Sequence, residues 1–448
     1  MNVGEELELT AQNAVYGGDC IARSAEGMVV FVPCMAPGDR ARVRVTHVRK
    51  NWAKGKILEI ISPGPDRIEA PCPFFGDCGG CQWQHISLDG QRRAKEEIVK
   101  ALFRPLGLDS KVSSIRGGAG GCGYRNRLIL PVRAGEDGKP RFGFYRASTH
   151  DIVEMDSCLV QNPALWTVAR SVIELAREYG WSGYDENSGV GMLRHILVRH
   201  SPATMESGVV LVTAGVSLPS GKRAAARLME KSRNVVAVMQ NVNARRTNVI
   251  LGEKTVLLGG LPYMNEKCGG LRLRTAPAAF FQANPGVTEI MLGILREWAW
   301  DERGGILDLY CGGGLLGLAA ARNAAWLVGI EEERRAVSDA RANAKSNSRI
   351  KTAFYAGPVG KILPKMASRL GGLGTVIADP PRKGLAPAVL RAISGLPARR
   401  LLYISCDPST LARDLKSLVS CGYSLEEAVP LDMFPQTYHI EVMARLTR

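Results

Sequence analysis

From about residue 285 to the end of the chain, short apolar runs alternate with helical stretches, and this rhythm constrains the fold more than any other feature. The apolar runs are GGILDLYCG, AWLVGIE, KTAFYAG, GTVIADPP and RRLLYIS. Strands that alternate with helices form a parallel sheet with both faces covered. The last two runs, GYSLEEAVPLDMF and YHIEVMARL, have no helix between them, which predicts an antiparallel hairpin added to the sheet. We therefore predict an α/β, Rossmann-like domain over residues 276–448.

The segment ILDLYCGGGLLGLAAA (306–321) reads as a strand, a glycine turn and a helix. Gly312, Gly313 and Gly314 let the backbone approach a ligand at the helix N-terminus, although their spacing is not the G-x-G-x-x-G of dinucleotide-binding folds. Glu331 ends the next strand run, where a carboxylate can accept hydrogen bonds from ribose hydroxyls. With the terminal hairpin, this arrangement resembles the S-adenosylmethionine-dependent methyltransferase fold and its seven-stranded sheet.

The N-terminal part of the chain has a different texture. Residues 1–62 alternate like short strands with glycine-rich turns, which predicts a small OB-like β-barrel over residues 1–65 of the kind that carries oligonucleotides. Between Arg40 and Lys56 lie seven Lys or Arg residues, no acid, and Trp52. This pattern suits a solvated strand face, or phosphate contact with base stacking. The net charge of +15 favours nucleic acid as the partner.

The middle of the chain, residues 66–275, is predicted to form a separate α+β domain. It is rich in strand-like runs, with one good helix in PALWTVARSVIELAREYG, and this pattern is typical of an antiparallel sheet with a helix. A further helix is expected over 87–107, with Ser87 as its N-cap and Pro105 and Gly107 at its end. This helix is a candidate to pack on the C-terminal domain.

Three cysteines cluster in PCPFFGDCGGCQWQH: Cys72, Cys78 and Cys81. The chain has eleven cysteines, an odd number, and no signal peptide, so we expect a reducing cytoplasm in which clustered thiols bind metal or act in catalysis. Three thiolates among Gly and Pro indicate a metal site. Spacing alone leaves the fourth ligand open between Cys122, Cys158 and His85, and it does not separate zinc from iron–sulfur.

A single cysteine, Cys406, follows the strand run RRLLYIS and precedes a helical stretch in YISCDPSTLARD. It therefore lies at the carboxyl edge of the sheet, where such folds place ligands, although most lone cysteines only pack. Asp379 likewise ends a strand run, and His439 and Glu441 lie on the terminal hairpin. An acid between Ile440 and Val442 in a strand is either exposed at an edge or buried, and burial would raise the pKa of Glu441 towards that of a useful base.

The motifs DLYCGGG, DPPRKG, SCDPSTLARD, HIE and FFQAN, in their order and spacing, resemble those of the RNA uracil-5-methyltransferases. The resemblance covers essentially the whole chain, and the N-terminal barrel resembles a TRAM domain. It implies S-adenosyl-L-methionine as the cofactor, Cys406 as the nucleophile and Glu441 as the base. Asp379 and Gln282 would hydrogen-bond the flipped uracil or the cofactor. The cofactor-binding residues implied are Gln282, Tyr310, Leu315, Glu331 and Asp379.

The resemblance also selects a ligand set among the cysteines. In proteins with this CGGC-x-x-QH pattern the fourth ligand is the Cys after the central strands, which here is Cys158. With Cys72, Cys78 and Cys81 it would hold a [4Fe–4S] cluster that folds and orients the RNA-binding part, since methyl transfer needs no electron.

The implied chemistry explains the residue types. Carbon 5 of uracil is a poor nucleophile, and a thiolate that adds to carbon 6 turns the ring into an enolate whose carbon 5 can attack a methyl group. A base must then take the proton from carbon 5 so that the thiolate is expelled. Cys406 and Glu441 would supply these two functions.

Two positions depart from the family pattern. Leu315 stands where the glycine turn usually continues with a small polar residue, and Pro358 stands where relatives commonly carry an Asp that binds the adenosine part of the cofactor. Both changes remove polar contacts from the expected pocket.

The expected function is formation of 5-methyluridine in ribosomal RNA (23S). A transfer-RNA uracil methyltransferase is the first alternative, and a non-catalytic RNA-binding or assembly factor is the second. We expect a cytoplasmic monomer without a membrane partner, because no apolar run approaches the ~20 residues that span a bilayer.

Overall fold

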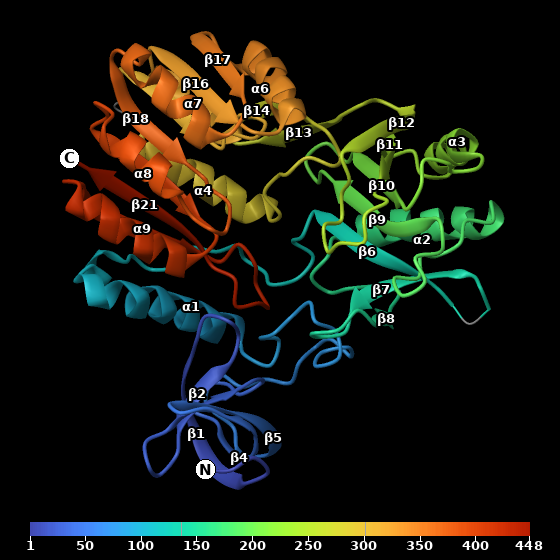
Figure 1. The fold of residues 1–448 in the computed structure, drawn as a ribbon, viewed down its shortest axis with the longest axis vertical. Helices are drawn as coiled ribbons and strands as arrows, with labels where there is room; N and C mark the ends of the chain where they lie inside the picture. The colour runs from blue at the N-terminus through green and yellow to red at the C-terminus, as the bar shows by residue number, and fades with distance from the viewer. Residues whose placement is uncertain (136, 301) are drawn as a thin grey trace.

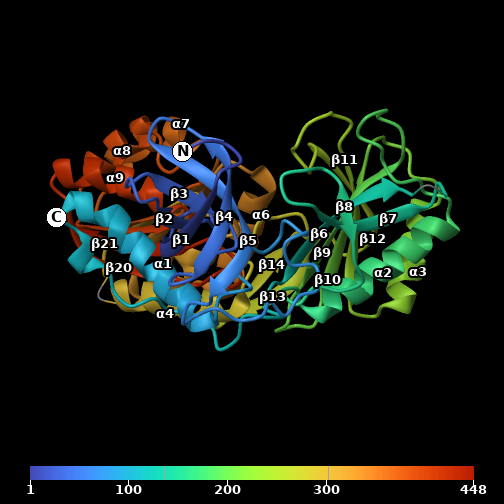
Figure 2. The same cartoon turned by 90° about the horizontal axis from the view of Figure 1, so that it is seen from below.

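The computed structural model describes residues 1–135, 137–300 and 302–448. Figure 1 shows a C-terminal domain and a central domain side by side, with an N-terminal barrel below them next to helix α1; Figure 2 views the same arrangement from the barrel side. No helix in the described part of the chain is long and apolar enough to cross a membrane.

The N-terminal region is a closed five-stranded barrel with the strand order β1-β2-β3-β5-β4, as the sequence predicts. Its strands are β1 (Glu6–Ala14), β2 (Cys20–Arg23), β3 (Val29–Val32), β4 (Arg40–Val48) and β5 (Trp52–Ser62). Along β4, exposed and buried residues alternate, because successive side chains of a strand point to opposite faces. The apolar half of β4 thus fills the barrel, and its arginines face outward.

The outward arginines of β4 are not free charges. Arg40 pairs with Glu8, Arg42 with Glu59 at 2.7 Å, and Arg44 with Glu6 at 2.7 Å. The stretch that carries no acid in sequence therefore faces glutamates from β1 and β5. Ion pairing between strands lowers the positive potential that the sequence alone indicates here.

The central domain contains a seven-stranded sheet with the order β12-β11-β10-β9-β6-β7-β8. Helices α2 and α3 contact strands of this sheet. Neighbouring strands are antiparallel except β10 and β11, which α3 connects as a parallel pair. The elements are β6 (Arg127–Ala134), β7 (Pro140–Tyr145), β8 (Ile152–Glu154), α2 (Pro163–Glu178), β9 (Leu193–His200), β10 (Ser207–Thr213), α3 (Gly221–Lys231), β11 (Val235–Val242) and β12 (Lys254–Gly260).

Helix α1 (Leu88–Phe103) begins after Ser87, whose hydroxyl accepts a hydrogen bond from Gly90 N at 3.1 Å. The helix contacts α9 (Pro408–Ser420) and β20 (Ser424–Leu431) of the C-terminal domain. A buried ion pair joins them, with Lys95 Nζ 2.7 Å from Asp432 Oδ1 and both side chains excluded from solvent. Apolar residues of the barrel, of α1 and of one face of the C-terminal sheet belong to one continuous hydrophobic cluster.

A small hairpin of β13 (Met264–Cys268) and β14 (Leu271–Thr275) precedes the C-terminal domain. In helix α6 (Arg334–Asn347), the side-chain oxygens of Asn347 and Asn343 accept hydrogen bonds from Arg272 N at 2.9 Å and Arg274 N at 2.7 Å. The hairpin is therefore held by the helix that it covers.

The C-terminal domain is built on a seven-stranded sheet with the order β17-β16-β15-β18-β19-β21-β20. The first five strands in this order are parallel, and β21 is antiparallel to both β19 and β20. This confirms the Rossmann-like domain with an added hairpin. The strands are β15 (Gly305–Leu309), β16 (Trp326–Glu331), β17 (Lys351–Ala356), β18 (Leu373–Ala378), β19 (Arg400–Ser405), β20 (Ser424–Leu431) and β21 (Glu441–Thr447).

Helices cover both faces of this sheet. Residues of α4, α5 and α6 share one hydrophobic cluster with the sheet, and residues of α7, α8 and α9 share the other. These helices are α4 (Pro285–Trp298), α5 (Leu315–Ala320), α6 (Arg334–Asn347), α7 (Val359–Met366), α8 (Pro387–Ser394) and α9 (Pro408–Ser420). Short 3₁₀ turns occur at Arg104–Leu106, Asp109–Lys111, Ala321–Asn323 and Ala367–Arg369.

Candidate active site

The residues singled out by the sequence meet at one edge of the C-terminal sheet. Because β15, β18 and β19 are parallel, the residues that follow them lie at the same edge. Tyr310 follows β15, Asp379 follows β18 and Cys406 follows β19. Glu441 begins the antiparallel strand β21 beside β19, since Val442 pairs with Ser405. The fold thus gathers four side chains from distant parts of the chain.

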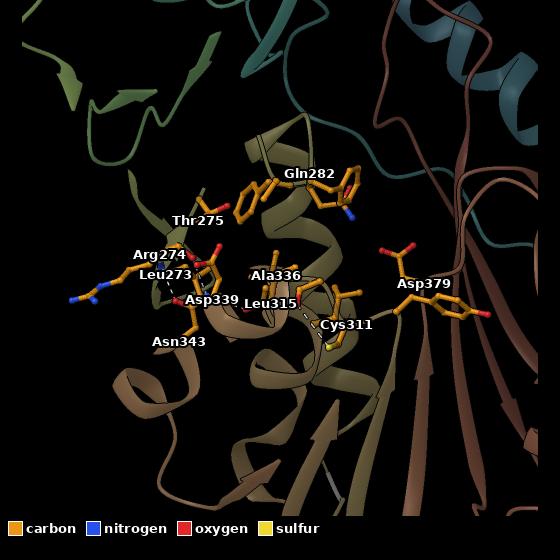
Figure 3. Close-up of a pocket in the computed structure, with 17 residues that line it drawn as sticks. Leu273, Arg274, Thr275, Gln282, Cys311, Leu315, Ala336, Asp339, Asn343 and Asp379 are labelled. Atoms are coloured by element: carbon orange, nitrogen blue, oxygen red, sulfur yellow. Dashed lines mark hydrogen bonds between the residues drawn. The ribbon is translucent and has the colours of Figure 1, made fainter. Parts of the chain in front are cut away.

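A pocket with an empty volume of about 590 Å³ opens beside these strand ends. Four of the predicted cofactor residues, Gln282, Tyr310, Leu315 and Asp379, line it. Figure 3 shows the amide of Gln282 and the carboxylate of Asp379 facing one another on one side, with Asp339 and Asn343 on the other. Among the described residues, the pocket lining includes Asp379 but not Cys406 or Glu441, which lie beside the pocket at the same sheet edge.

The glycine turn forms the floor of the pocket. Tyr310, Gly312 and Gly314 have φ values of 62°, 51° and 85°, and glycine adopts this left-handed region at least cost. Gly312 N donates to Glu331 Oε2 at 3.0 Å, and Glu333 N donates to Glu331 Oε1 at 2.8 Å. Glu331 therefore holds the turn, while the pocket itself is lined by the turn and not by Glu331.

Several pocket residues were not found by the sequence analysis. Thr275 and Arg274 come from the β13–β14 hairpin, and Asp339 and Asn343 come from α6. Asn343 Nδ2 donates to Gly313 O at 2.9 Å and to Arg274 O at 3.1 Å, which joins hairpin, helix and glycine turn. The sequence carries a signal for the two residues of α6. Asp339 and Asn343 are four positions apart, so they lie on one face of the helix, which also carries its buried alanines.

The two departures from the family pattern differ in position. Leu315 is the first residue of α5 and lines the pocket, so an apolar side chain replaces a polar contact there. Pro358 is the N-cap of α7 and does not line the pocket. The chain can therefore accept proline at 358, where its fixed φ suits a helix start.

Cys406 is half-buried in the turn between β19 and α9. Burial and the nearby carboxyl groups of Glu441 and Asp379 raise the pKa of its thiol to about 11. The next residue, Asp407, caps α9 by accepting hydrogen bonds from Ser409 N and Thr410 N, both at 3.0 Å. The backbone beside the thiol is thus fixed by a helix cap.

Glu441 is buried, with 3% of its surface exposed. Burial and the neighbouring Asp379 raise its pKa well above the usual range, and the nearby Arg382 acts in the opposite direction. Of the two positions that the sequence leaves open for this carboxyl group, an exposed strand edge or a buried site, the structure shows the buried one. Burial also raises the pKa of Asp379, with a contribution from Glu331.

Asp308 in β15 is a second buried acid that the sequence analysis did not select. Burial raises its pKa to about 8, although its Oδ2 accepts a hydrogen bond from Gly317 N at 2.9 Å. Its Oδ1 has no partner among the described residues. Asp308 lies beneath the glycine turn and ties α5 to β15.

The four cysteines of the predicted ligand set lie near one another. Cys78 forms a β-bridge with Arg146, and Gly79 N donates to Tyr145 O at 2.9 Å, which folds the cysteine segment against the end of β7. Burial raises the pKa of Cys81, and the thiols of Cys158, Cys78 and Cys72 raise it further.

The rival ligands are placed differently. Cys122 is exposed, and of the cysteines in the predicted ligand set only Cys72 affects its pKa. His85 is buried with Nε2 3.1 Å from Met35 O in the barrel. In the described ranges, no group of three or more His, Cys, Asp or Glu side chains is arranged to hold a metal ion.

Comparison with known families gives two matches. The model of the tRNA (uracil-5-)-methyltransferase family matches residues 222–354 and 370–448, and that of the TRAM domain matches residues 2–58. An uncharacterized RNA methyltransferase from Halalkalibacterium halodurans is 37% identical over 100% of this chain and 98% of its own length. Another from Gloeobacter violaceus is 39% identical over 99% of this chain and 97% of its own.

A solved structure is similar over nearly the same extent. The tRNA (uracil-54, C5)-methyltransferase of Pyrococcus abyssi, in complex with S-adenosyl-L-homocysteine, has a TM-score of 0.76 and 26% identity. The similarity covers 98% of this chain and 100% of that one. With full-length relatives above 30% identity, the chain belongs to the RNA uracil-5-methyltransferase family and carries a TRAM domain.

Proposed function

We propose that this chain transfers a methyl group from S-adenosyl-L-methionine to carbon 5 of a uridine in RNA, through a covalent bond between Cys406 and the base. The observation that carries the proposal is the convergence of Cys406, Glu441 and Asp379 at one sheet edge beside the pocket. Groups whose pKa values are shifted by burial and by each other are typical of catalytic sites.

The residues around the pocket fit the cofactor. Backbone amides at the start of α5, with Tyr310, Leu315 and Gln282, would hold it, and Glu331 would act by fixing the glycine turn. When bound, S-adenosyl-L-methionine supplies an electrophilic methyl group on a sulfonium cation. A cation near Asp379 and Glu441 favours their ionised forms, which opposes the effect of burial on both pKa values.

The protein residues would then divide the work. Cys406 would lose its proton to water and add to carbon 6 of uracil as the thiolate, which makes the ring an enolate. Carbon 5 of the enolate would then take the methyl group, and the electron pair of the broken carbon–sulfur bond would stay on the donor sulfur. Glu441 takes the proton from carbon 5, the carbon 5–carbon 6 double bond forms again, and the sulfur of Cys406 leaves. Gln282 and Asp379, which face one another, would bind the polar edge of the flipped base.

We also propose that Cys72, Cys78, Cys81 and Cys158 hold a [4Fe–4S] cluster. The thiols of Cys72, Cys78 and Cys158 lie near enough to Cys81 to raise its pKa, and this proximity supports the set. The exposure of Cys122 argues against the rival ligand. Each is half-buried, at the edge of the central domain. Cluster binding would order the cysteine segment against β7.

Iron content tests the ligand set without an activity assay. Anaerobically purified protein should be brown, with about four irons per chain, as the cluster type requires. Cys158→Ser should bleach it and Cys122→Ser should not. Stoichiometric zinc without iron in the wild-type protein would contradict the assignment.

For the substrate, we propose ribosomal RNA, with transfer RNA as the second candidate. The second candidate is favoured by the similarity to the Pyrococcus abyssi enzyme, which acts on tRNA. Total RNA from cells that lack the protein should be incubated with labelled cofactor and then separated by size. Label in the large ribosomal fraction would support the first candidate, and label in the small fraction the second. Absence of label from all RNA would contradict the enzyme activity.

A further inference from the structure

The turn between β1 and β2 of the barrel reaches the catalytic loop. Tyr16 lies in this turn, and its hydroxyl is 3.3 Å from Asp407 Oδ2 and 3.4 Å from Cys406 O. Both acceptors belong to the segment that carries the predicted nucleophile. The hydroxyl can donate to either oxygen, and burial with the nearby Asp407 raises the pKa of Tyr16, so that it stays a donor.

The ring of Tyr16 makes a second contact with the site. It lies edge-on to Tyr438, with the ring centroids 5.5 Å apart, and Tyr438 in turn packs on His439 at 4.3 Å. Glu441 follows His439 by two residues. One tyrosine of the barrel therefore contacts both segments that carry the predicted catalytic pair.

The turn itself is fixed against the rest of the molecule. Trp83 Nε1 donates to Gly18 O at 2.9 Å, and a Cβ at Gly18, where φ is 102°, would lie 3.1 Å from Tyr438 Cδ1. Tyr16 and Tyr438 also pack against the hydrophobic cluster that joins the barrel, α1 and the C-terminal sheet. The barrel is thus docked on the active site and not merely linked to it by a flexible chain.

We propose that Tyr16 is a positioning residue for the methyl-transfer reaction, through which the TRAM barrel fixes the Cys406–Asp407 segment and the loop before Glu441. The expected effect of Tyr16 on turnover rests on the proposed function. The expected effect of Tyr16 on the exposure of the Cys406 thiol does not. The role of the barrel then extends beyond RNA binding to the geometry of the nucleophile.

Two substitutions separate the contacts of Tyr16. Tyr16→Phe removes the hydroxyl and keeps the ring against Tyr438, so kcat should fall about three- to tenfold, the range of one lost hydrogen bond. Tyr16→Ala removes both contacts and should lower kcat further. The KM for RNA should stay at the wild-type value in both variants. Tyr179→Phe, which removes the same hydroxyl in the central domain, is the matched control and should leave kcat unchanged.

Alkylation of the thiol provides a readout that needs neither RNA nor cofactor. Iodoacetamide labelling should be followed by mass spectrometry on the peptide with Cys406, with the exposed Cys421 as an internal reference. Loosening the segment gives the thiol more contact with water, so labelling of Cys406 should become faster in both Tyr16 variants while Cys421 stays constant. Thermal unfolding of the same samples checks that the variants are folded.

The proposal requires both effects. A rise in KM with kcat unchanged would mean that Tyr16 serves RNA binding alone, and would overturn it. Unchanged labelling of Cys406 in folded Tyr16→Ala would also overturn it. If the wild-type protein methylated no RNA, the proposed function would fail, and the labelling experiment alone would decide whether the barrel fixes the thiol.

Discussion

The pocket, which forms the binding end of the site, and the adjoining sheet edge with Cys406 and Glu441, which forms its reacting end, are built in different ways. At the binding end, backbone and amide groups are paired: Asn343 joins the hairpin to Gly313, and Glu331 accepts hydrogen bonds from Gly312 and Glu333. At the reacting end, Cys406 and Glu441 have pKa values raised by burial and by nearby carboxyl groups. Groups that are hydrogen-bonded to one another form a rigid binding surface. Groups whose pKa values are shifted by burial and by nearby charges are typical of sites that transfer protons.

Removal of the thiol should have the largest effect on the reacting end. Cys406→Ala should abolish methylation, because no enolate forms without the sulfur, while cofactor binding at the other end should persist. Methyl transfer to RNA and calorimetric binding of the cofactor measure the two ends separately. Cys421→Ala, at an exposed position near the end of α9, is the control and should be fully active. Residual methylation by Cys406→Ala would refute its role as nucleophile.

Removal of the base should stop the reaction at a later step. In Glu441→Gln, addition and methyl transfer can still occur, but the proton on carbon 5 remains, so the sulfur cannot leave. Methylated RNA should therefore stay attached to the protein on a denaturing gel. Glu426→Gln, at an exposed position on the neighbouring strand β20, should release its product normally. A Glu441→Gln enzyme with full turnover would show that another group removes the proton.

Asp308 lies beneath the binding end, and its buried carboxyl should make stability depend on pH. Its pKa is raised in the folded protein from near 4 to about 8, so between these values the folded state holds a proton that the unfolded state has released. Stability should therefore fall as pH rises through this window. Asp308→Asn should remove that part of the decline in stability. Across the window, the change in its free energy of unfolding should differ from that of the wild type by at least about 1.4 kcal/mol, the free energy of one pKa unit.

Urea unfolding at pH 5 and at pH 8 measures this effect. The free energy of unfolding of Asp308→Asn minus that of the wild type should be larger at pH 8 than at pH 5. Asp156→Asn, at an exposed position, is the matched control. An identical pH dependence in the Asp308→Asn variant and the wild type would show that the carboxyl is ionised in the folded state.

The smallest effect is expected where the binding end has lost a polar contact. Leu315→Ser places a hydroxyl at the first residue of α5 and should lower the KM for the cofactor about two- to tenfold, the range of one added hydrogen bond. The rate of the thiol chemistry should not change. Pro358→Asp should leave this KM unaltered, because Pro358 starts α7 outside the pocket. A larger change in the KM for the cofactor at position 358 than at position 315 would contradict the placement of Leu315 in the pocket and of Pro358 outside it.

Much of the fold follows from local patterns in the sequence. The rhythm of strands and helices gives the C-terminal sheet, and the missing helix after β20 gives the hairpin that carries Glu441. The strand ends locate Asp379 and Cys406, because parallel strands place their ends at one edge. Tyr310 is implied by the family resemblance alone. The apolar neighbours of Glu441 leave open whether its side chain is exposed at a strand edge or buried, and the structure shows that it is buried.

The remaining features depend on contacts between distant segments. Arg42 appears unpaired in its own stretch and is neutralised by Glu59 on another strand. Asp339 and Asn343 enter the pocket because α6 packs under the β13–β14 hairpin. Tyr16 reaches Asp407 across 391 positions of sequence. Local periodicity predicts which face of an element is buried, but it does not predict the element that covers that face.

The central claim, that Cys406 forms a covalent bond to carbon 6 of uridine, is tested most directly with RNA that contains 5-fluorouridine. Fluorine at carbon 5 cannot be removed by a base, so the methylated adduct should accumulate on the wild-type protein. After nuclease and protease digestion, mass spectrometry should find the modified nucleotide on the peptide that carries Cys406. Absence of a stable adduct, or an adduct on any other residue, would contradict the account.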